Sequence, residues 1–114
     1  MYKRQIPAWS RYALESHDGY RFTSPAGSFR ANAFGLHDMH GNVWEWCNDW
    51  YSDTYYSESP VDDPQGPAWS EMKVRRGGSW HSWPLYVRSA FRNYNTTESR
   101  YVGVGMRLAM SLSE

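Results

Sequence analysis

One stretch, residues 35–51, constrains the fold more than any other part of the chain; it reads GLHDMHGNVWEWCNDWY. Neither the period of a helix nor that of a strand accounts for its three tryptophans and Val43. The pattern instead predicts a fixed loop whose aromatic rings fill a core while its oxygen atoms face a ligand that needs oxygens. A calcium ion is the simplest such ligand. We also expect a short helical turn near Trp44–Trp50, where this loop ends.

The remaining composition limits the class of protein. A chain of 114 residues can form one domain, and its seven Trp, nine Tyr and four Phe can supply a core from few aliphatic side chains. The 12 basic residues balance the 12 acidic ones, which argues against a nucleic-acid or polybasic membrane surface. No apolar run approaches the roughly 20 residues of a membrane helix, and no signal-peptide pattern is present. These features predict a soluble protein.

Outside the tryptophan-rich stretch, the chain contains many turn residues and few periodic segments. Residues 18–34 carry several turn signals, and residues 52–70 form a long polar surface connection with three prolines. Residues 73–80 predict a short strand that enters a glycine turn, and residues 87–92 fit one helical turn or a strand. Residues 101–110 predict a closing strand with one apolar face: Val102, Val104, Met106, Leu108 and Met110. We therefore expect a loop-rich α+β domain with a small antiparallel sheet late in the chain.

Several motifs together resemble one known family. They occur in the family's order: residues 25–36, residues 34–51, Arg76–Trp80, Arg88–Asn93 and Gly105–Ala109. The chain is thus similar to the formylglycine-generating enzyme, or sulfatase-modifying factor, family. The resemblance implies a C-type-lectin-like fold. It also implies that residues 18–114 form the C-terminal part of the family domain, about half of it, preceded by a non-matching segment, 1–17.

The resemblance implies a calcium site in the tryptophan-rich stretch. Calcium takes about six to eight oxygen ligands from carboxylates, carbonyls and water. In the family, the corresponding loop uses two side chains and two carbonyls, which here are those of Asp38, Glu45, Gly41 and Val43. The alternative is structural: Asp38 would cap a turn and Glu45 would pair with an arginine.

A second calcium site of the family matches only in part. Asp18 and the carbonyl of Tyr20 correspond to two of its ligands. The other ligands would come from residues before the matching part of this chain. We therefore expect this second site to be incomplete.

The resemblance also locates the family's active-site segment, which follows the Gly-Gly-Ser turn. Family members that make formylglycine bind copper(I) there through two cysteines, and soft thiolates suit that ion. Here, residues 77–88 contain no cysteine; Ser79 lies in the turn, and Ser82 falls at the first thiol position. Copper binding and formylglycine formation by the known route are therefore not expected. We interpret Ser79 as a hydroxyl that bridges the turn, with a nucleophile as the alternative.

Other residues have both a structural and a functional interpretation. Cys47 is the only cysteine, and among aromatic residues it is expected to be a small buried side chain rather than a redox centre. His37, His40 and His81 are expected to be hydrogen-bonded or solvated loop residues, with metal ligation as the alternative. The arginines are expected to pair with carboxylates, Asp49 being a natural partner, with substrate-anion binding as the alternative. They are Arg75, Arg76, Arg88, Arg92 and Arg107.

Rings and small polar side chains of residues 80–101 resemble an adaptable recognition surface. Its candidate ligand-binding residues are Trp80, His81, Trp83, Tyr86, Tyr94 and Tyr101. We expect a calcium-stabilised ligand-binding or accessory domain that has lost the copper thiols. Its partner would be a small molecule, a peptide or a protein, not nucleic acid, and further domains of a longer parent protein are possible. The alternative is an oxidoreductase fragment of the formylglycine-generating or non-haem iron sulfoxide synthase type.

Overall fold

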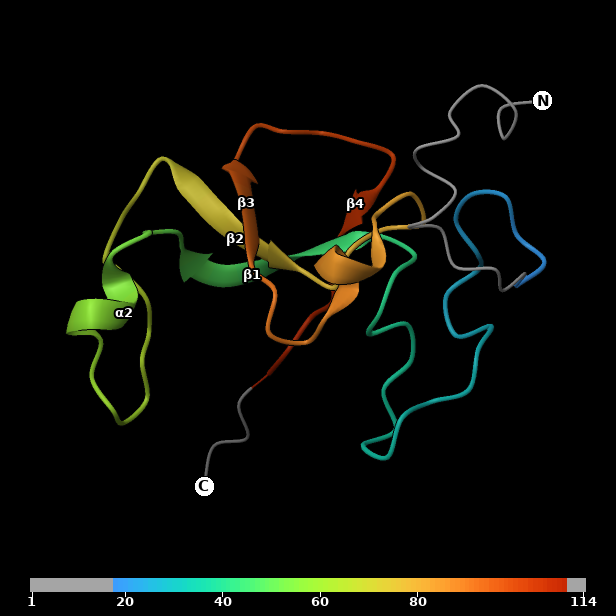
Figure 1. The fold of residues 1–114 in the computed structure, drawn as a ribbon, viewed down its shortest axis with the longest axis horizontal. Helices are drawn as coiled ribbons and strands as arrows, with labels where there is room; N and C mark the ends of the chain where they lie inside the picture. The colour runs from blue at the N-terminus through green and yellow to red at the C-terminus, as the bar shows by residue number, and fades with distance from the viewer. Residues whose placement is uncertain (1–17, 111–114) are drawn as a thin grey trace.

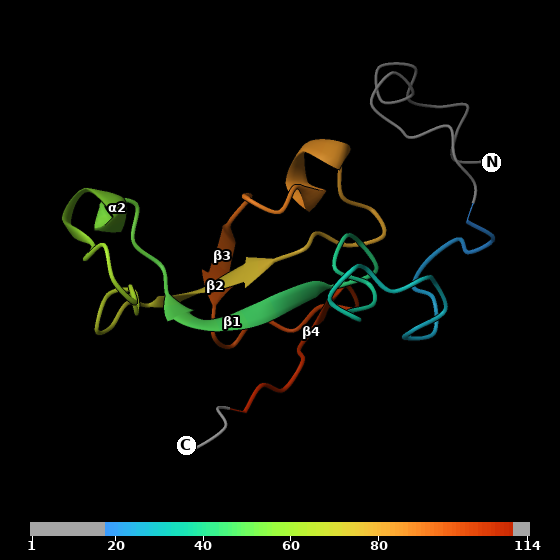
Figure 2. The ribbon, with the colours of Figure 1, turned by 90° about the horizontal axis from the view of Figure 1, so that it is seen from below.

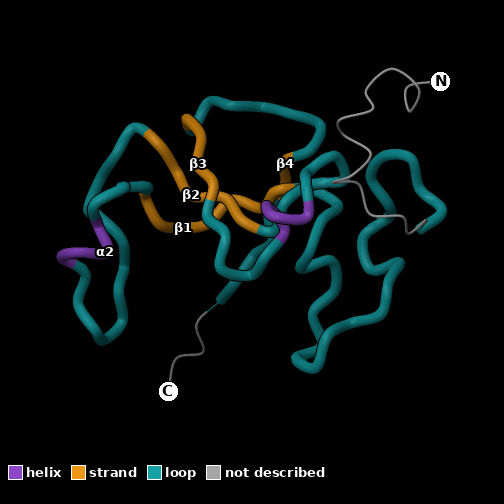
Figure 3. Tube along the Cα trace, viewed as in Figure 1, coloured by secondary structure: helices purple, strands orange, loops and turns teal. Residues whose placement is uncertain are grey.

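The computed structural model describes residues 18–110, which form a four-stranded sheet with short helices in its connections (Figure 1). The strands are β1 (Trp44–Trp50), β2 (Met72–Arg76), β3 (Asn93–Thr96) and β4 (Val104–Gly105). The helices are α2 (Tyr55–Glu58) and a 3-10 helix, η2 (Pro84–Val87). The strand order is β3-β2-β1-β4. Most of the described chain is loop (Figure 3), as the turn-rich sequence predicts.

The sheet is mixed rather than purely antiparallel. β1 pairs antiparallel with β2, and β2 pairs antiparallel with β3, but β4 runs parallel to β1. In Figure 2 the sheet is a curved ribbon, with α2 beyond one end of β1 and the early loops beyond the other. The α+β class and the loop-rich character are confirmed, whereas the expectation of an antiparallel sheet holds for only three of the four strands.

The segment Trp44–Trp50 is a strand, so the expected helical turn there is wrong. β1 is the longest strand, and both its edges are hydrogen-bonded, one to β2 and the other to β4. The register moves from Trp46 opposite Arg75 to Trp50 opposite Lys73, which requires an irregularity in β1. Such irregularities interrupt the alternation of side chains. This is the physical reason why no strand period is visible in the sequence.

The predicted strand and glycine turn at residues 73–80 are confirmed by β2 and the two glycines that follow it. Gly77 and Gly78 have φ values of 89° and 75°, a conformation that favours glycine. Gly78 also lies against η2. A Cβ atom at this position would be 2.5 Å from Cγ1 of Val87.

The predicted closing strand at residues 101–110 is much shorter than expected. Only Val104 and Gly105 pair with a neighbour, and they do so at the edge of the sheet. Beyond them the chain leaves the sheet, and Leu108 is 92% exposed. Alternating apolar residues therefore do not form a buried face here, because no further partner strand or covering layer lies against them within residues 18–110.

The buried core of the described residues is small. Its hydrophobic members are Val74, which is fully buried in the central strand β2, and Trp44, which is 6% exposed. Trp46 and Trp50 are half-buried, so the expectation that the rings of residues 35–51 fill a core holds fully only for Trp44. Among residues 18–110, no helix is long and apolar enough to cross a membrane.

Candidate functional site

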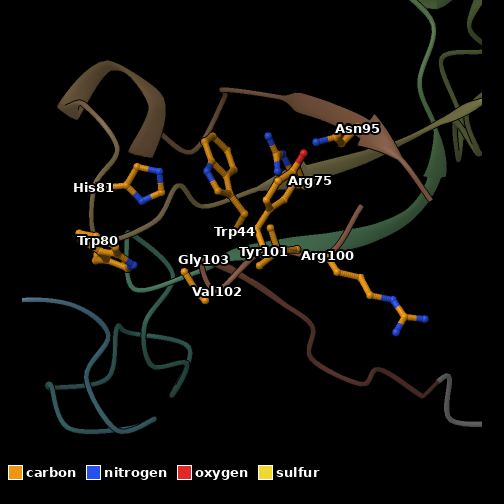
Figure 4. Close-up of a pocket in the computed structure, with 10 residues that line it drawn as sticks. Trp44, Arg75, Trp80, His81, Asn95, Arg100, Tyr101, Val102 and Gly103 are labelled. Atoms are coloured by element: carbon orange, nitrogen blue, oxygen red, sulfur yellow. The ribbon is translucent and has the colours of Figure 1, made fainter. Parts of the chain in front are cut away.

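A cavity of about 670 Å³ lies beside the first residues of β1 and the loop that leads into β4 (Figure 4). Its walls come from three parts of the chain: residue 44, residues 75–81 and residues 95–104. Trp44 comes from β1, Arg75 from β2, and Trp80 with His81 from the loop after the glycine turn. Tyr101 completes this wall from the loop before β4. A volume of this size is typical of sites for small molecules.

The sheet places Trp44 and Arg75 on the same face. Arg75 lies opposite Trp46, and side chains two positions apart on a strand share a face, so Trp44 also faces Arg75. The guanidinium carbon of Arg75 is 5.2 Å from the centroid of the Trp44 ring. The backbone N–H of Trp44 donates to the carbonyl of Gly103 at 2.7 Å, which fixes the wall from the C-terminal segment.

Two serines and a histidine form a hydrogen-bonded cluster next to the cavity. Ser79 is buried, and its Oγ lies 3.1 Å from Nδ1 of His81 and 3.0 Å from Oγ of Ser82. The Ser79 hydroxyl thus bridges His81 and Ser82 within the turn, as expected. In addition, the Ser79 N–H donates to Oγ of Ser82 at 2.9 Å. Gly103 packs on this cluster, because a Cβ atom there would lie 3.4 Å from both Ser79 Cβ and His81 Cε1. The polar atoms of this cluster are hydroxyl oxygens and an imidazole nitrogen, and no thiol belongs to it.

The structure gathers three of the six candidate ligand-binding residues at the cavity: Trp80, His81 and Tyr101. The other three lie elsewhere. Trp83 and Tyr86 stack with their ring centroids 6.1 Å apart in and beside η2, and Tyr94 stacks on Tyr51 at 3.8 Å. Composition alone cannot tell the residues that line the cavity from those that do not. For Tyr94 the reason is that its side-chain direction on β3 depends on the register with β2.

Several residues of the cavity wall were not among the ligand-binding residues predicted from the sequence. Trp44 was assigned to the core, and Asn95 and Arg100 were not singled out as candidates. Arg75 was expected to pair with a carboxylate, with substrate-anion binding as the alternative. A signal that could have identified Arg75 and Asn95 is their position on one face of adjacent strands, since Asn95 pairs with Lys73 two positions from Arg75. That signal becomes visible only once the strand pairing is known.

The predicted calcium loop has the conformation of the structural alternative. The Asp38 carboxylate accepts a hydrogen bond from the Gly27 N–H at 2.7 Å, which caps a turn. Both oxygens of Glu45 accept hydrogen bonds from Arg107, at 2.6 Å from Nε and 2.5 Å from Nη2. The Arg107 Nη2 also donates to the carbonyl of His37 at 3.0 Å. One guanidinium thus joins the loop to β1.

The two predicted carboxylate ligands act on the same cationic group. The hydrogen bond that Arg107 donates to Glu45 raises the pKa of Arg107, and the charge of Asp38 adds to that increase. The carbonyl of Val43 turns towards Gly77, where a Cβ atom would lie 4.0 Å from it. In chemical type these oxygens fit a hard cation. In this structure the positive charge beside Glu45 is the guanidinium of Arg107.

The partial second calcium site has a local structure of its own. The N–H of Tyr20 donates to Oδ1 of Asp18 at 2.9 Å, and both residues are exposed. Asp18 therefore caps the turn that contains Tyr20. The further ligands were expected from residues before Asp18, and the segment 1–17 lies outside the described part of the chain.

Carboxylate pairing accounts for two of the five arginines. Arg92 pairs with Asp49 at 3.1 Å, as predicted for Asp49, and Arg107 pairs with Glu45. The guanidinium groups of the others donate to backbone or amide oxygens: Arg76 to Ser89, Arg88 to Leu85 and Arg75 to Asn93.

Cys47 has the environment of a structural cysteine. It lies half-buried on β1, and its sulfur is 3.9 Å from the carbonyl oxygen of Glu45. Burial raises the pKa of the Cys47 thiol, and the charge of Asp49 raises it further. A thiol of raised pKa is a poor nucleophile at neutral pH, because the thiolate is the reactive form.

The loop histidines serve as hydrogen-bonding residues. Nδ1 of His37 lies 2.6 Å from the carbonyl of Phe29, and Nδ1 of His40 lies 2.6 Å from the carbonyl of Val87. Within residues 18–110, no three His, Cys, Asp or Glu side chains are grouped so that they could hold a metal ion. A calcium site here would therefore depend on backbone carbonyls as well as on carboxylates.

Comparison with known proteins gives consistent results. Residues 2–112 match the family described as "Sulfatase-modifying factor enzyme 1-like domain". The formylglycine-generating enzyme of Streptomyces coelicolor is 45% identical over 97 residues, covering 82% of this chain and 31% of that protein. The structure of PvdO from Pseudomonas aeruginosa matches with a TM-score of 0.69 and 40% identity, over 78% of this chain and 34% of that one.

A second solved structure is similar over a larger share of this chain. Treponema denticola variable protein 1 matches with a TM-score of 0.70 and 32% identity, over 88% of this chain and 36% of that one. The chain spans about a third of the length of these proteins.

Proposed function

Because this chain belongs to the family of sulfatase-modifying factor enzyme 1-like domains, we propose that it is a ligand-binding or accessory domain without formylglycine-forming activity. Its ligand, a small molecule, a peptide or a protein, would bind in the cavity beside β1. A calcium ion would stabilise the loop of residues 38–45. We also propose that the fold is C-type-lectin-like, as the resemblance implies.

The observation that carries this proposal is the pair of serine hydroxyls after the glycine turn. The resemblance assigns copper-binding cysteines to this segment, and here Ser79 and Ser82 bond to each other at 3.0 Å. A hydroxyl is too hard and too weakly acidic to replace a thiolate on copper(I). Cys47, the one thiol of the chain, lies on β1, does not line the cavity and has a raised pKa.

The cavity supports the ligand-binding part of the proposal. It combines indole rings of Trp44 and Trp80 with the polar ends of His81 and Tyr101, an arrangement typical of sites that orient a ligand with few polar groups. Its position beside the Gly-Gly-Ser turn is the position that the resemblance gives to the family's active segment.

The calcium part of the proposal rests on the oxygen atoms of one loop. The side chains of Asp38 and Glu45 and the carbonyls of Gly41 and Val43 are the ligands that the resemblance implies. The Asp38 and Glu45 charges already act on one cationic group, Arg107. Calcium would replace that guanidinium at Glu45.

The catalytic part of the proposal is tested by oxygen consumption. The chain is incubated with copper(I), a reductant and a cysteine-containing sulfatase peptide, and the Streptomyces coelicolor formylglycine-generating enzyme serves as the active control. We expect oxygen uptake from the control and none above background from this chain, with no loss of the peptide thiol. Copper-dependent oxidation of the peptide by this chain would refute the proposal.

An oxidoreductase is the second candidate, as a fragment of the formylglycine-generating or non-haem iron sulfoxide synthase type. It is favoured by the 45% identity to a protein named formylglycine-generating enzyme. The same oxygen assay, repeated with iron(II) in place of copper, distinguishes the two candidates.

A further inference from the structure

Arg75 differs from the ion-paired arginines in the described part of the chain. Arg92 and Arg107 each contact a carboxylate, whereas no carboxylate of residues 18–110 lies within ion-pair distance of Arg75. Its Nε donates to Oδ1 of Asn93 at 3.0 Å, a neutral amide. Burial lowers the pKa of Arg75. A half-buried guanidinium without a counter-charge favours the binding of an anion.

None of the described residues that line the cavity around Arg75 is acidic. Besides Arg75, its polar groups are those of Asn95, His81 and Tyr101, which can donate hydrogen bonds, and Arg100 at the rim. In Figure 4 the Arg100 side chain extends away from the other residues, so Arg75 is the cation that faces the interior. The electrostatic potential of this cavity therefore favours a negatively charged ligand.

The other side chains of the cavity are apolar. The ring of Trp44 forms one wall, and Trp80 with Val102 and Val104 forms another part of the lining. A free inorganic anion would leave these surfaces in contact with water. A ligand with an apolar or aromatic part would cover them and gain from their burial.

We infer that this cavity binds an organic oxyanion, in which a carboxylate or phosphate group lies at Arg75 and an attached aromatic or apolar part lies against Trp44. This inference rests on the proposed ligand-binding function and specifies its ligand class. The N–H edge of the planar guanidinium can hold two oxygens of either group, while its carbon lies 5.2 Å from the centroid of the Trp44 ring. Asn95 and Tyr101 line the same cavity and carry hydrogen-bond donors.

The test compares three probes on the full chain: N-acetyl-Gly-Phe with a free carboxylate, the same dipeptide as its neutral amide, and phenyl phosphate. None of them contains an indole, so quenching of protein tryptophan fluorescence reports occupancy beside Trp44 and Trp80. We expect the carboxylate, the phosphate or both to bind at least about tenfold more tightly than the amide, as a charge-assisted hydrogen bond predicts. The stronger of the two anions identifies the source of the oxyanion.

Variants assign the effect to Arg75. Arg75→Gln is expected to lower the affinity for the anionic probe to that of the amide without changing amide binding, and Arg75→Lys is expected to retain part of the preference. Arg30→Gln removes the same charge from an exposed position outside the cavity and should leave all affinities unchanged. Thermal melting of each variant identifies any that fail to fold, and the comparison of acid with amide on the unmodified chain is independent of them.

Three results would refute the oxyanion inference. Equal binding of acid, phosphate and amide would refute the oxyanion inference and leave the ligand-binding proposal intact. An anion preference that persists in a folded Arg75→Gln variant would also refute it. Absence of binding by all three probes would refute it as well, while the oxygen assay separately tests the proposed lack of catalysis.

Discussion

Replacing Arg107 by glutamine is expected to strengthen calcium binding rather than weaken it. Arg107 occupies both oxygens of Glu45 through hydrogen bonds of 2.5 and 2.6 Å, and a calcium ion would need the same oxygens. The guanidinium and the ion therefore compete. Removing the guanidinium leaves the Glu45 carboxylate free in the ion-free state, so binding no longer has to break an ion pair.

The size of this effect follows from the exposure of the pair. The side chains of Arg107 and Glu45 are 39% and 20% exposed, so solvent screens their attraction. An ion pair of this exposure contributes about 0.5–1 kcal/mol. If that contribution is lost when calcium binds, the dissociation constant of calcium should fall by about two- to fivefold in the Arg107→Gln variant.

Calorimetric titration with calcium measures this change directly, and thermal melting in calcium or chelator provides a second measurement. Calcium at a hundred times its dissociation constant should add about 2.7 kcal/mol to the free energy of unfolding. Glu45→Gln should abolish that stabilisation. Glu58→Gln, which neutralises an exposed glutamate on α2, should retain it and serves as the matched control.

Two outcomes would refute the reasoning. If Arg107→Gln binds calcium no more tightly than the unmodified chain, Arg107 is not a competitor. If Glu45→Gln keeps the full calcium response, the ion does not use this carboxylate, and the proposed site is wrong.

Two other residues give predictions that need no ligand. Gly78→Ala should lower the free energy of unfolding by about 1–2 kcal/mol from its left-handed backbone and by about 1–3 kcal/mol more from the clash with Val87. Gly27→Ala has the same backbone conformation with no atom within 4 Å, so in denaturant titrations it should show only the first loss; equal losses would refute the clash. Cys47 should be alkylated more slowly in the native chain than in the denatured one at pH 8, since burial and Asp49 raise its pKa. A native alkylation rate equal to the denatured one would contradict this environment. The raised pKa of Cys47 also predicts that the free energy of unfolding falls as the pH rises above the ordinary pKa of a thiol, because the unfolded chain then ionises first.

The local signals of the sequence predicted the parts of the fold that depend on neighbouring residues. The strand at residues 73–76 and its glycine turn follow from an apolar and basic segment next to two glycines with positive φ. The bridging hydroxyl of Ser79 also follows from its place in that turn.

The features that sequence reasoning missed depend on partners far along the chain. Trp44–Trp50 was not predicted as a strand because an irregularity in its pairing with β2 obscures the period. The closing strand was predicted too long because alternation in residues 101–110 requires a partner strand, and only Val104 and Gly105 have one. Arg75 could be assigned to the cavity only after the register placed it on the Trp44 face.

The parallel pairing of β4 with β1 has a consequence for folding. It joins position 44 to position 104, so the two walls that this pairing brings together belong to segments that meet only after the long intervening chain has closed into a loop. Contacts of such wide sequence separation form late and slow the overall reaction. The amide of Trp44 donates to Gly103, so its native-state hydrogen-exchange rate would measure how often this pairing, and with it the cavity wall, opens.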